Sequence, residues 1–372
     1  MLVISWEDYC VEEPQNLETP AMLLFQDMML HNLESVCKLV GGGQNLFAHV
    51  KTHKSEAVAR HQVKAGIGSF KCATLKELEM VLEAGASKAL LSYPQAQERK
   101  IERLCDLASS YPNAWIAAIA SSPVHVDLLG EVATKRDCDL RVMLDLDAGM
   151  HRTGIGFGDK AEKLYRRIDT HPFLQVAGFH LYDGHNELSD PIEREAAAKR
   201  NAVSLQSFKK TIENKGMEVP CLVAGGGFSG IYYARTEGMF GSPGTFVYWD
   251  AGYTKLMPDM PYRCAALVLT NVVDRYPDEG TITTDLGSKG VSSDLPLPER
   301  AFLLGHDSAR LVGQSEEHGV FQISSELPQV GDYLLAVPGH VCPTTIRYPG
   351  IHVVNSAGEI VDYYLHTARD RL

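Results

Sequence analysis

Residues 47–54 read Phe-Ala-His-Val-Lys-Thr-His-Lys, and the fold can be worked out from this stretch. The run 45–50 is short and apolar and ends in polar residues, which predicts a buried strand. Thr52 or Ser55 can cap the helical pattern that follows. Lys51 is therefore expected where a strand gives way to a loop, and in a parallel α/β fold that edge is where ligands bind.

The position of Lys51 suggests a chemical role for its amine. A lysine held against apolar walls loses part of its hydration, so its charged form is disfavoured. The neutral amine can then attack a carbonyl carbon and form a Schiff base. The alternative is a surface lysine at the end of a strand, and a short motif does not decide between the two without its context.

The sequence from residue 45 onward alternates between strand-like and helical patterns. Apolar, strand-like runs occupy residues 45–50, 67–73, 88–93, 115–121, 140–146, 174–181, 220–225 and 244–249. Helical patterns separate them at 54–65, 75–84, 96–109, 123–135, 159–169, 191–215 and near 229–239. The pattern contains eight candidate strands with helices between them, and no large insertion interrupts it. It therefore favours a closed (β/α)8 TIM barrel over an open doubly wound sheet.

The pattern changes after about residue 255. Short β-branched or alternating runs replace the helical periodicity at 262–274, 280–286, 300–304, 319–324, 332–337, 351–355 and 359–366. Gly, Pro, Asp and Asn punctuate these runs, which indicates an all-β domain. We therefore predict an N-terminal segment over 1–26 that packs with the β domain, a barrel over 27–255 and a C-terminal β domain over 256–372.

Composition limits the classes of function. The chain has 372 residues, 45% of them hydrophobic, and a net charge of −12. This charge disfavours nucleic acid or an anionic membrane as a partner, and no run is apolar enough to cross a bilayer. Eight scattered cysteines without a CxxC pair, and a start without a signal-peptide pattern, predict a reducing, cytoplasmic setting (Cys10, Cys37, Cys72, Cys105, Cys138, Cys221, Cys264, Cys342).

Polar loops follow the last predicted barrel strands, where barrel chemistry gathers. They cover residues 145–154, 180–185, 224–230 and 241–245, with Thr245 opening the eighth predicted strand. Consecutive glycines such as Gly225-Gly226-Gly227 let backbone N–H groups converge on an anion. The loops after strands seven and eight often bind phosphate in barrels, although a glycine run is also common in tight turns.

Three side chains in these loops are candidates for binding a ligand. Arg152 can stabilise a phenolate or carboxylate with paired donors, and Tyr182 or His180 can lie against an aromatic ring. The alternatives are a loop salt bridge from Arg152 to Asp145 or Asp147, and a core imidazole at His180 whose hydrogen bonds are satisfied.

A metal pair is the candidate in the β domain. Residues 338–344 read Pro-Gly-His-Val-Cys-Pro-Thr. In an extended backbone, positions two apart point to the same side, so His340 and Cys342 can reach one metal. Imidazole and thiolate with open positions suit Zn²⁺ as a Lewis acid. The alternative is a proline-bounded turn in which the pair is incidental.

Together these stretches resemble the fold-type III, alanine racemase-like pyridoxal-phosphate enzymes. The closest likeness is to their metal-dependent subfamily of D-serine dehydratase, D-threo-3-hydroxyaspartate dehydratase and D-threonine aldolase. Three motifs carry it, in order along most of the chain: His-Val-Lys-Thr-His-Lys at 49–54, Gly-Met-His-Arg-Thr-Gly at 149–154, and His-Val-Cys at 340–342.

The resemblance implies a role for each candidate residue. Lys51 would form the Schiff base with pyridoxal 5′-phosphate (PLP). Arg152 would lie near the phenolic oxygen of the cofactor, with Tyr182 and His180 as further cofactor-binding residues and Tyr182 beside the pyridine ring. The positions that resemble phosphate-binding ones are Gly226, Gly227, Gly244 and Thr245. His340 and Cys342 match the pair that binds zinc or another divalent metal, and such enzymes are usually homodimers.

The activity implied is that of a PLP- and zinc-dependent lyase that dehydrates a D-3-hydroxy amino acid to a 2-oxo acid and ammonia. Aldolases of the subfamily generally carry Asp at the position of Cys342, and dehydratases carry Cys. Retro-aldol cleavage of the D-threonine aldolase type is the nearest alternative. An amino-acid racemase, a non-catalytic PLP carrier and a cofactor-free barrel acting on sugar phosphates are more distant ones.

Overall fold

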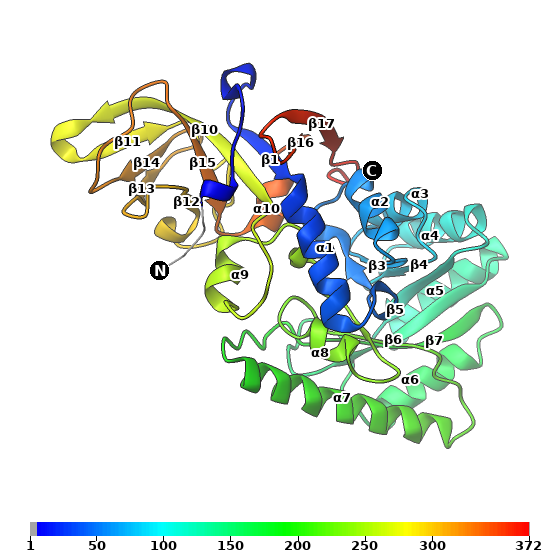
Figure 1. Ribbon diagram of the computed structural model, residues 1–372. Coiled ribbons are helices and arrows are strands. Elements are labelled where there is room, and N and C mark those ends of the chain that lie inside the picture. Colours follow the sequence, from blue (N-terminus) through cyan, green and yellow to red (C-terminus); the bar gives the residue numbers. More distant parts are fainter. Residues whose placement is uncertain (1–5, 372) are drawn as a thin grey trace. The chain divides into compact units, whose positions relative to one another are not determined.

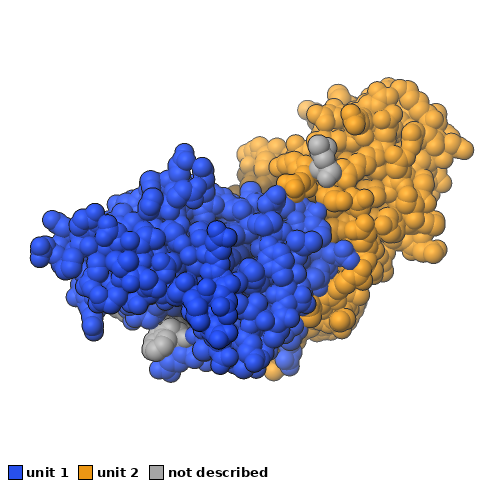
Figure 2. Space-filling view, turned by 90° about the horizontal axis from the view of Figure 1, so that it is seen from above, with its two compact units in different colours: residues 1–35, 52–58, 245–369 blue, residues 36–51, 59–244, 370–372 orange. Residues whose placement is uncertain are grey.

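The computed structural model describes residues 6–371 (Figure 1). They form two compact units, each made of separate stretches of chain (Figure 2). Unit 1 combines residues 1–35, of which 6–35 are described, with 52–58 and 245–369. Unit 2 combines 36–51, 59–244 and 370–372, the last residue lying outside the description. Among the described helices, none has the length and apolar character that crossing a bilayer requires.

Unit 2 contains an eight-stranded parallel sheet in which each strand pairs with the next along the chain, which confirms the predicted barrel. Its strands are β2 (Ala48–His49), β3 (Ser69–Cys72), β4 (Lys88–Leu91), β5 (Trp115–Ala120), β6 (Leu140–Asp147), β7 (Leu174–Tyr182), β8 (Leu222–Ala224) and β9 (Phe240–Gly241). Two backbone bonds connect its ends: Phe47 N–H donates to Gly241 O at 2.8 Å, and His49 N–H donates to Pro243 O at 2.9 Å.

Helices alternate with these strands. The α-helices of the chain are α1 (Gln26–Val40), α2 (Glu56–Lys64), α3 (Leu75–Glu83), α4 (Glu98–Ser110), α5 (Pro123–Arg136), α6 (Asp159–Asp169), α7 (Pro191–Glu213), α8 (Gly230–Ala234), α9 (Ala251–Leu256) and α10 (Val341–Thr345). In unit 2, α3 packs against β3 and β4, and α6 packs against β6 and β7 (Figure 1).

Local caps explain where several of these helices begin. Thr74 accepts a hydrogen bond from the Glu77 N–H before α3, and Asp190 accepts from Ile192 and Glu193 before α7. Short 3-10 helices complete the regular structure: η1 (Trp6–Asp8), η2 (Pro14–Asn16), η3 (Gly43–Asn45), η4 (Val50–Thr52), η5 (Thr245–Val247), η6 (Pro277–Glu279) and η7 (Leu297–Glu299).

The eighth barrel strand differs from the prediction. The run 244–249 was expected to be a strand opened by Thr245, but Thr245 begins η5 and the strand is β9 at Phe240–Gly241. An apolar run without periodicity does not distinguish a strand from another buried segment. Here residues 244–249 are buried throughout, so hydrophobicity alone pointed to the wrong position.

The barrel interior is filled by one face of its strands. The cluster comprises Phe47, Leu90, Ala117, Ile119, Met143, Ala177, Cys221 and Val223, with Trp115 and Phe240 against it. Side chains two apart on a strand share a face, so on β6 Asp145 points to the same side as Met143. The apolar core therefore continues toward the carboxyl ends of the strands as a layer of polar side chains.

A bulge in β7 sets which of its side chains share that layer. Val142 of β6 pairs with Val176, but Met143 pairs with Gly178, so Ala177 is an extra residue on β7. Beyond the bulge, Asp145 pairs with His180 and Asp147 with Tyr182. Gly178 has φ +110°, and a Cβ there would lie 1.8 Å from the Cys221 carbonyl oxygen.

Unit 1 contains a nine-stranded, largely antiparallel sheet, as the predicted β domain requires. Its strands are β1 (Ala21–Phe25), β10 (Ala266–Tyr276), β11 (Thr281–Thr284), β12 (Ala301–Leu303), β13 (Arg310–Gln314), β14 (Gly319–Gln322), β15 (Tyr333–Pro338), β16 (Gly350–Val354) and β17 (Ile360–Leu365). Strand β1 lies between β10, to which it is antiparallel, and β16, to which it is parallel. The prediction missed β13, whose burial alternates only weakly.

We predict that Gly178→Ala lowers the free energy of unfolding by about 3 kcal/mol, because a methyl group cannot be placed beside the Cys221 carbonyl at this φ. The matched control is Gly156→Ala, where a Cβ meets nothing within 4 Å. Urea unfolding followed by circular dichroism measures both. Equal midpoints for the two variants would show that the β7 bulge does not require glycine.

Candidate active site

Lys51 lies in η4, directly after β2, and lines a cavity of about 290 Å³ in unit 2. Its side chain is exposed. The expectation that apolar walls strip Lys51 of its hydration is therefore wrong in this structure. The expected position, at the carboxyl end of a barrel strand, is the one observed.

The cavity collects side chains from the ends of several strands. It is lined by His49, Lys51, Lys71, Ala73, Ser92, Tyr93, Pro94, Arg152, Thr153, His180 and Tyr182. Three of these carry cations in a chain whose net charge is −12. The local charge of the cavity is thus opposite to that of the whole molecule, which favours an anionic ligand.

Lys71 is the buried amine of the cavity. It is the third residue of β3, its residue is 3% exposed, and its Nζ lies 3.5 Å from Gly225 O. Burial lowers the pKa of Lys71 to about 7, and the positive charges of Lys51 and Arg152 act in the same direction. Asp145 and Asp183 oppose the shift without cancelling it. This amine therefore exists in both protonation states near neutral pH.

His180 and Asp145 form a buried pair. Nδ1 of His180 lies 2.7 Å from Oδ1 of Asp145. Burial, followed by the charge of Lys71, lowers the pKa of His180. A neutral imidazole that donates from Nδ1 to this carboxylate presents a lone pair at Nε2. Nε2 of His180 and Oδ2 of Asp145 are buried and have no hydrogen-bond partner, so His180 is not the fully satisfied core imidazole of the alternative.

Tyr182 and Arg152 are brought together. The Arg152 guanidinium carbon lies 4.6 Å from the centre of the Tyr182 ring, and Lys71 Nζ lies 5.1 Å from it. Cations at these distances are attracted to the face of an aromatic ring. Among the ion pairs of residues 6–371, Asp147 is paired with His151 and Asp145 with His180, and neither carboxylate is paired with Arg152.

A hydrogen-bonded chain shapes the glycine turn after β8. Asp183 accepts from Ser229 Oγ at 2.6 Å and from the Tyr233 hydroxyl at 2.7 Å. Ser229 Oγ in turn accepts the Gly226 N–H at 3.3 Å. A Cβ at Gly226 would lie 2.7 Å from the Tyr182 ring, so glycine at 226 leaves room for that ring.

The remaining predicted phosphate positions do not form one cluster within a unit. Gly227 lies half-buried in the same turn as Gly226. Gly244 belongs to unit 2, where a Cβ would lie 2.6 Å from the His49 carbonyl oxygen. Thr245 belongs to unit 1, and its Oγ1 lies 3.7 Å from Cys342 Sγ. A role for these four residues in binding phosphate stays a prediction.

The residues of the cavity fit PLP. Its cations suit the phosphate and the phenolic oxygen, and Tyr182 offers a ring face. The unpartnered Nε2 of His180 and Oδ2 of Asp145 supply polar atoms for a bound molecule. A volume of about 290 Å³ lies near the lower end of small-molecule sites.

His340 and Cys342 contact each other in unit 1, by a different geometry from the one expected. His340 is extended, but Cys342 lies in the first turn of α10, so the backbone is not a strand there. Burial acts to lower the pKa of His340. The hydrogen bond and charge of Cys342, together with the hydrogen bond to Asp294, outweigh burial and raise the pKa of His340 to about 9. A metal bound by this pair would displace the proton that His340 carries.

Other side chains surround this pair. Asp294 Oδ2 lies 2.6 Å from His340 Nδ1, the arrangement by which a carboxylate orients a metal-binding imidazole. Thr52 Oγ1 lies 3.2 Å from Cys342 Sγ. Across residues 6–371, no group of three or more His, Cys, Asp or Glu side chains is arranged to hold a metal. The donors fit Zn²⁺ with two protein ligands and open positions.

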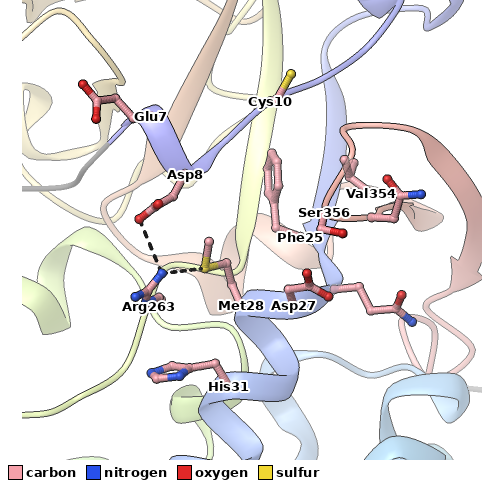
Figure 3. Close-up of a pocket in the computed structure, with 12 residues that line it drawn as sticks. Glu7, Asp8, Cys10, Phe25, Asp27, Met28, His31, Arg263, Val354 and Ser356 are labelled. Atoms are coloured by element: carbon pink, nitrogen blue, oxygen red, sulfur yellow. Dashed lines mark hydrogen bonds and ion pairs between the residues drawn. The ribbon is translucent and has the colours of Figure 1, made fainter.

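A second hollow, of about 450 Å³, lies in unit 1 between the N-terminal segment and the start of α1 (Figure 3). Arg263 in it is bound to Asp8 and contacts the Met28 sulfur (Figure 3). His31 bonds the Pro261 carbonyl oxygen. These two side chains have structural partners, and we assign the hollow no chemistry.

Sequence reasoning missed three residues that the structure places at these sites. Lys71, Asp145 and Asp294 were not singled out for the chemistry. For Lys71 a signal existed, because it is the one charged residue in the run 67–73. For Asp294 no local pattern was available, since the bond to His340 joins residues 46 apart in sequence.

Comparisons with known proteins agree with the two-part architecture of the chain. The family model "Alanine racemase, N-terminal domain" matches residues 26–251, and "Putative serine dehydratase domain" matches 265–354. A 3-hydroxy-D-aspartate aldolase of Paracoccus denitrificans is 25% identical over 345 residues, covering 89% of this chain and 87% of its own length. D-threo-3-hydroxyaspartate dehydratase of Delftia sp. is 23% identical over 385 residues, with coverages of 92% and 96%.

Among solved structures, D-threonine aldolase from Filomicrobium marinum is similar with a TM-score of 0.88 and 25% identity. The match covers 97% of this chain and 98% of that one. These relatives are lyases of D-amino acids in name, and PLP is the cofactor expected for alanine racemase-like barrels. The first family model covers well over half of the chain, and the chain therefore belongs to the alanine racemase N-terminal domain family.

Proposed function

We propose that this protein is a PLP- and metal-dependent lyase that dehydrates a D-3-hydroxy amino acid to a 2-oxo acid and ammonia. The observation that carries the proposal is the cavity in unit 2, where Lys51, Lys71 and Arg152 line one space with His180 and Tyr182. The family and the named relatives support the reaction class and the D-configured substrate.

Each predicted residue has a role in holding the cofactor. Lys51 would hold PLP through its amine, and Arg152 would lie at the phenolic oxygen. Tyr182 and His180 would lie against or beside the pyridine ring, and the phosphate would take Gly226, Gly227, Gly244 and Thr245. Bound PLP supplies an electron sink for the charge left when a bond at Cα breaks.

The chain itself moves the α-proton. With the substrate bound, Nζ of Lys51 would be the base that takes the proton from Cα. Burial keeps the pKa of His180 low, so its imidazole adds no charge to the cavity at neutral pH. Arg152 presents a planar guanidinium that can hold a carboxylate or phenolate with paired donors.

His340 and Cys342 would hold Zn²⁺ or another divalent metal, which supplies Lewis-acid activation of a hydroxyl group. Asp294 supports this assignment, because its bond to His340 Nδ1 fixes the ring orientation and leaves Nε2 for a ligand. Cys342 rather than Asp at this position favours dehydration over aldol cleavage, by the resemblance described above.

Retro-aldol cleavage is the second candidate. The Paracoccus and Filomicrobium relatives are both named aldolases, at 25% identity each. The same lysine and metal pair serves either reaction, since each begins with one bond broken at Cα of the same bound substrate. Racemisation and PLP carriage are less favoured, because neither uses the His340–Cys342 pair.

We further propose a homodimer in a reducing, cytoplasmic setting. All eight cysteines are free thiols in the structure, which fits such a compartment. The dimer rests on the resemblance, and light scattering of the purified protein measures its mass directly.

We predict that Lys51→Ala loses the near-visible absorbance of bound PLP and that turnover falls by at least about 100-fold, because the amine both holds the cofactor and takes the proton. Lys64→Ala is the matched control, an exposed lysine at the end of α2. Absorbance and oxo-acid release are measured on the wild type, Lys51→Ala and Lys64→Ala. An unchanged spectrum in Lys51→Ala would refute the assignment of this lysine.

We predict that a chelator abolishes turnover while PLP stays bound, and that added Zn²⁺ restores it, because the metal and the cofactor have separate ligands. D-threonine distinguishes the two reactions: dehydration gives 2-oxobutanoate and ammonia, and aldol cleavage gives glycine and acetaldehyde. Full activity in protein shown by elemental analysis to be free of metal would remove the metal from the proposal.

A further inference from the structure

Lys71 is a buried amine that the proposed roles leave unused. Its Nζ has the Gly225 carbonyl oxygen at 3.5 Å and the Tyr182 ring centre at 5.1 Å. Neither partner is an anion, so no carboxylate within residues 6–371 holds this amine in its charged form by direct contact. Burying a lysine without a paired carboxylate costs stability, and groups of this kind occur most often at functional sites.

Strand register brings Lys71 and Lys51 to the same space. Cα of Lys71 on β3 is paired with Cα of His49 on β2, and Lys51 follows two residues later. The Lys51 N–H lies 3.4 Å from Nδ1 of that same His49. Both lysines line the cavity of about 290 Å³. After burial, the charge of Lys51 is the largest cause of the lowered pKa of Lys71.

The charged and titratable groups that face Lys71 come from five parts of unit 2. Lys51 reaches it from η4, Arg152 from the loop after β6, Asp145 from β6 and Asp183 from the turn after β7. His180, neutral by its lowered pKa, faces it from β7. The resulting pKa of about 7 for Lys71 means that the ammonium dominates below neutral pH and the amine above it.

We propose that Lys71 is a second acid–base residue of this site and shuttles a proton between Lys51 and the β-oxygen of the bound amino acid. The inference rests on the proposed function and deepens it. A single amine that takes the α-proton must lose that proton before the next turnover, and a neighbouring amine that lines the same cavity is a suitable acceptor.

The proton balance of this shuttle is complete within the site. Nζ of Lys51 takes the proton as the Cα–H bond breaks, and passes it to the neutral amine of Lys71. The Lys71 ammonium then gives it to the hydroxide that departs from Cβ, which leaves as water. Both lysines end neutral and no external acid is consumed. In aldol cleavage the same path runs in reverse, from the hydroxyl group to Cα.

The competing explanation is structural: Lys71 would only fill space beneath Tyr182. The test compares Lys71→Met, which keeps the side-chain length without the amine, with Lys71→Arg, which keeps a charge that never dissociates. The control is Lys88→Met, the same change on β4, where Nζ lies 5.3 Å from the Phe240 ring and outside the cavity lining.

Borohydride reduction and peptide mapping of each protein first locate the pyridoxyl group. The absorbance of bound PLP is then titrated with pH, and turnover is measured. We expect the label on Lys51 in every variant. A spectral transition near pH 7 should occur in the wild type and Lys88→Met and be missing from Lys71→Met and Lys71→Arg. Turnover of both Lys71 variants should fall by roughly 100-fold or more.

The outcomes separate the two levels of the proposal. Absence of a pyridoxyl label in the wild type sinks the proposed function itself. A label on Lys51, with unchanged titration and turnover in Lys71→Arg, overturns the shuttle alone, and this variant decides the question even if Lys71→Met fails to fold. A label on Lys71 would also overturn it, because that amine would then be the cofactor's own lysine.

Discussion

Two backbone hydrogen bonds close the barrel, and the positions of the cavity residues depend on them. The Phe47 N–H bonds to Gly241 O at 2.8 Å and the His49 N–H to Pro243 O at 2.9 Å, joining the first strand region to the last. Once the sheet is closed, alternate side chains of every strand must point inward. Lys71 and Asp145 become neighbours for this reason, although 74 positions separate them in the sequence.

Barrel closure also brings several positively charged side chains into one cavity, where their mutual repulsion is unfavourable. Lys51, Lys71 and Arg152 line one cavity, and the positive charges of Lys51 and Arg152 disfavour the charge on Lys71. The fold offsets part of this cost through Asp145, Asp183 and the face of Tyr182. The remaining repulsion is reduced when an anion binds in the cavity or when the Lys71 ammonium loses its proton. A cavity with these properties favours an anionic ligand.

The units show how separate stretches of chain contribute to each site. Residues 52–58 leave unit 2 immediately after Lys51 and join unit 1, where Thr52 contacts Cys342. Residue 244 belongs to one unit and Thr245 to the other. The motif at 49–54 and the dipeptide Gly244-Thr245 therefore each contribute residues to both units.

The sequence by itself determined the alternating elements, the barrel class, the β domain and the position of Lys51 after a strand. Each follows from periodicity or short spacing, which are local properties. Only the tertiary structure decided that Lys71 rather than Lys51 is the buried amine, that β9 lies at Phe240–Gly241, and that Asp145 holds His180 and Asp294 holds His340. Burial and hydrogen-bond partners depend on which distant strands become neighbours, and single-chain periodicity does not carry that information.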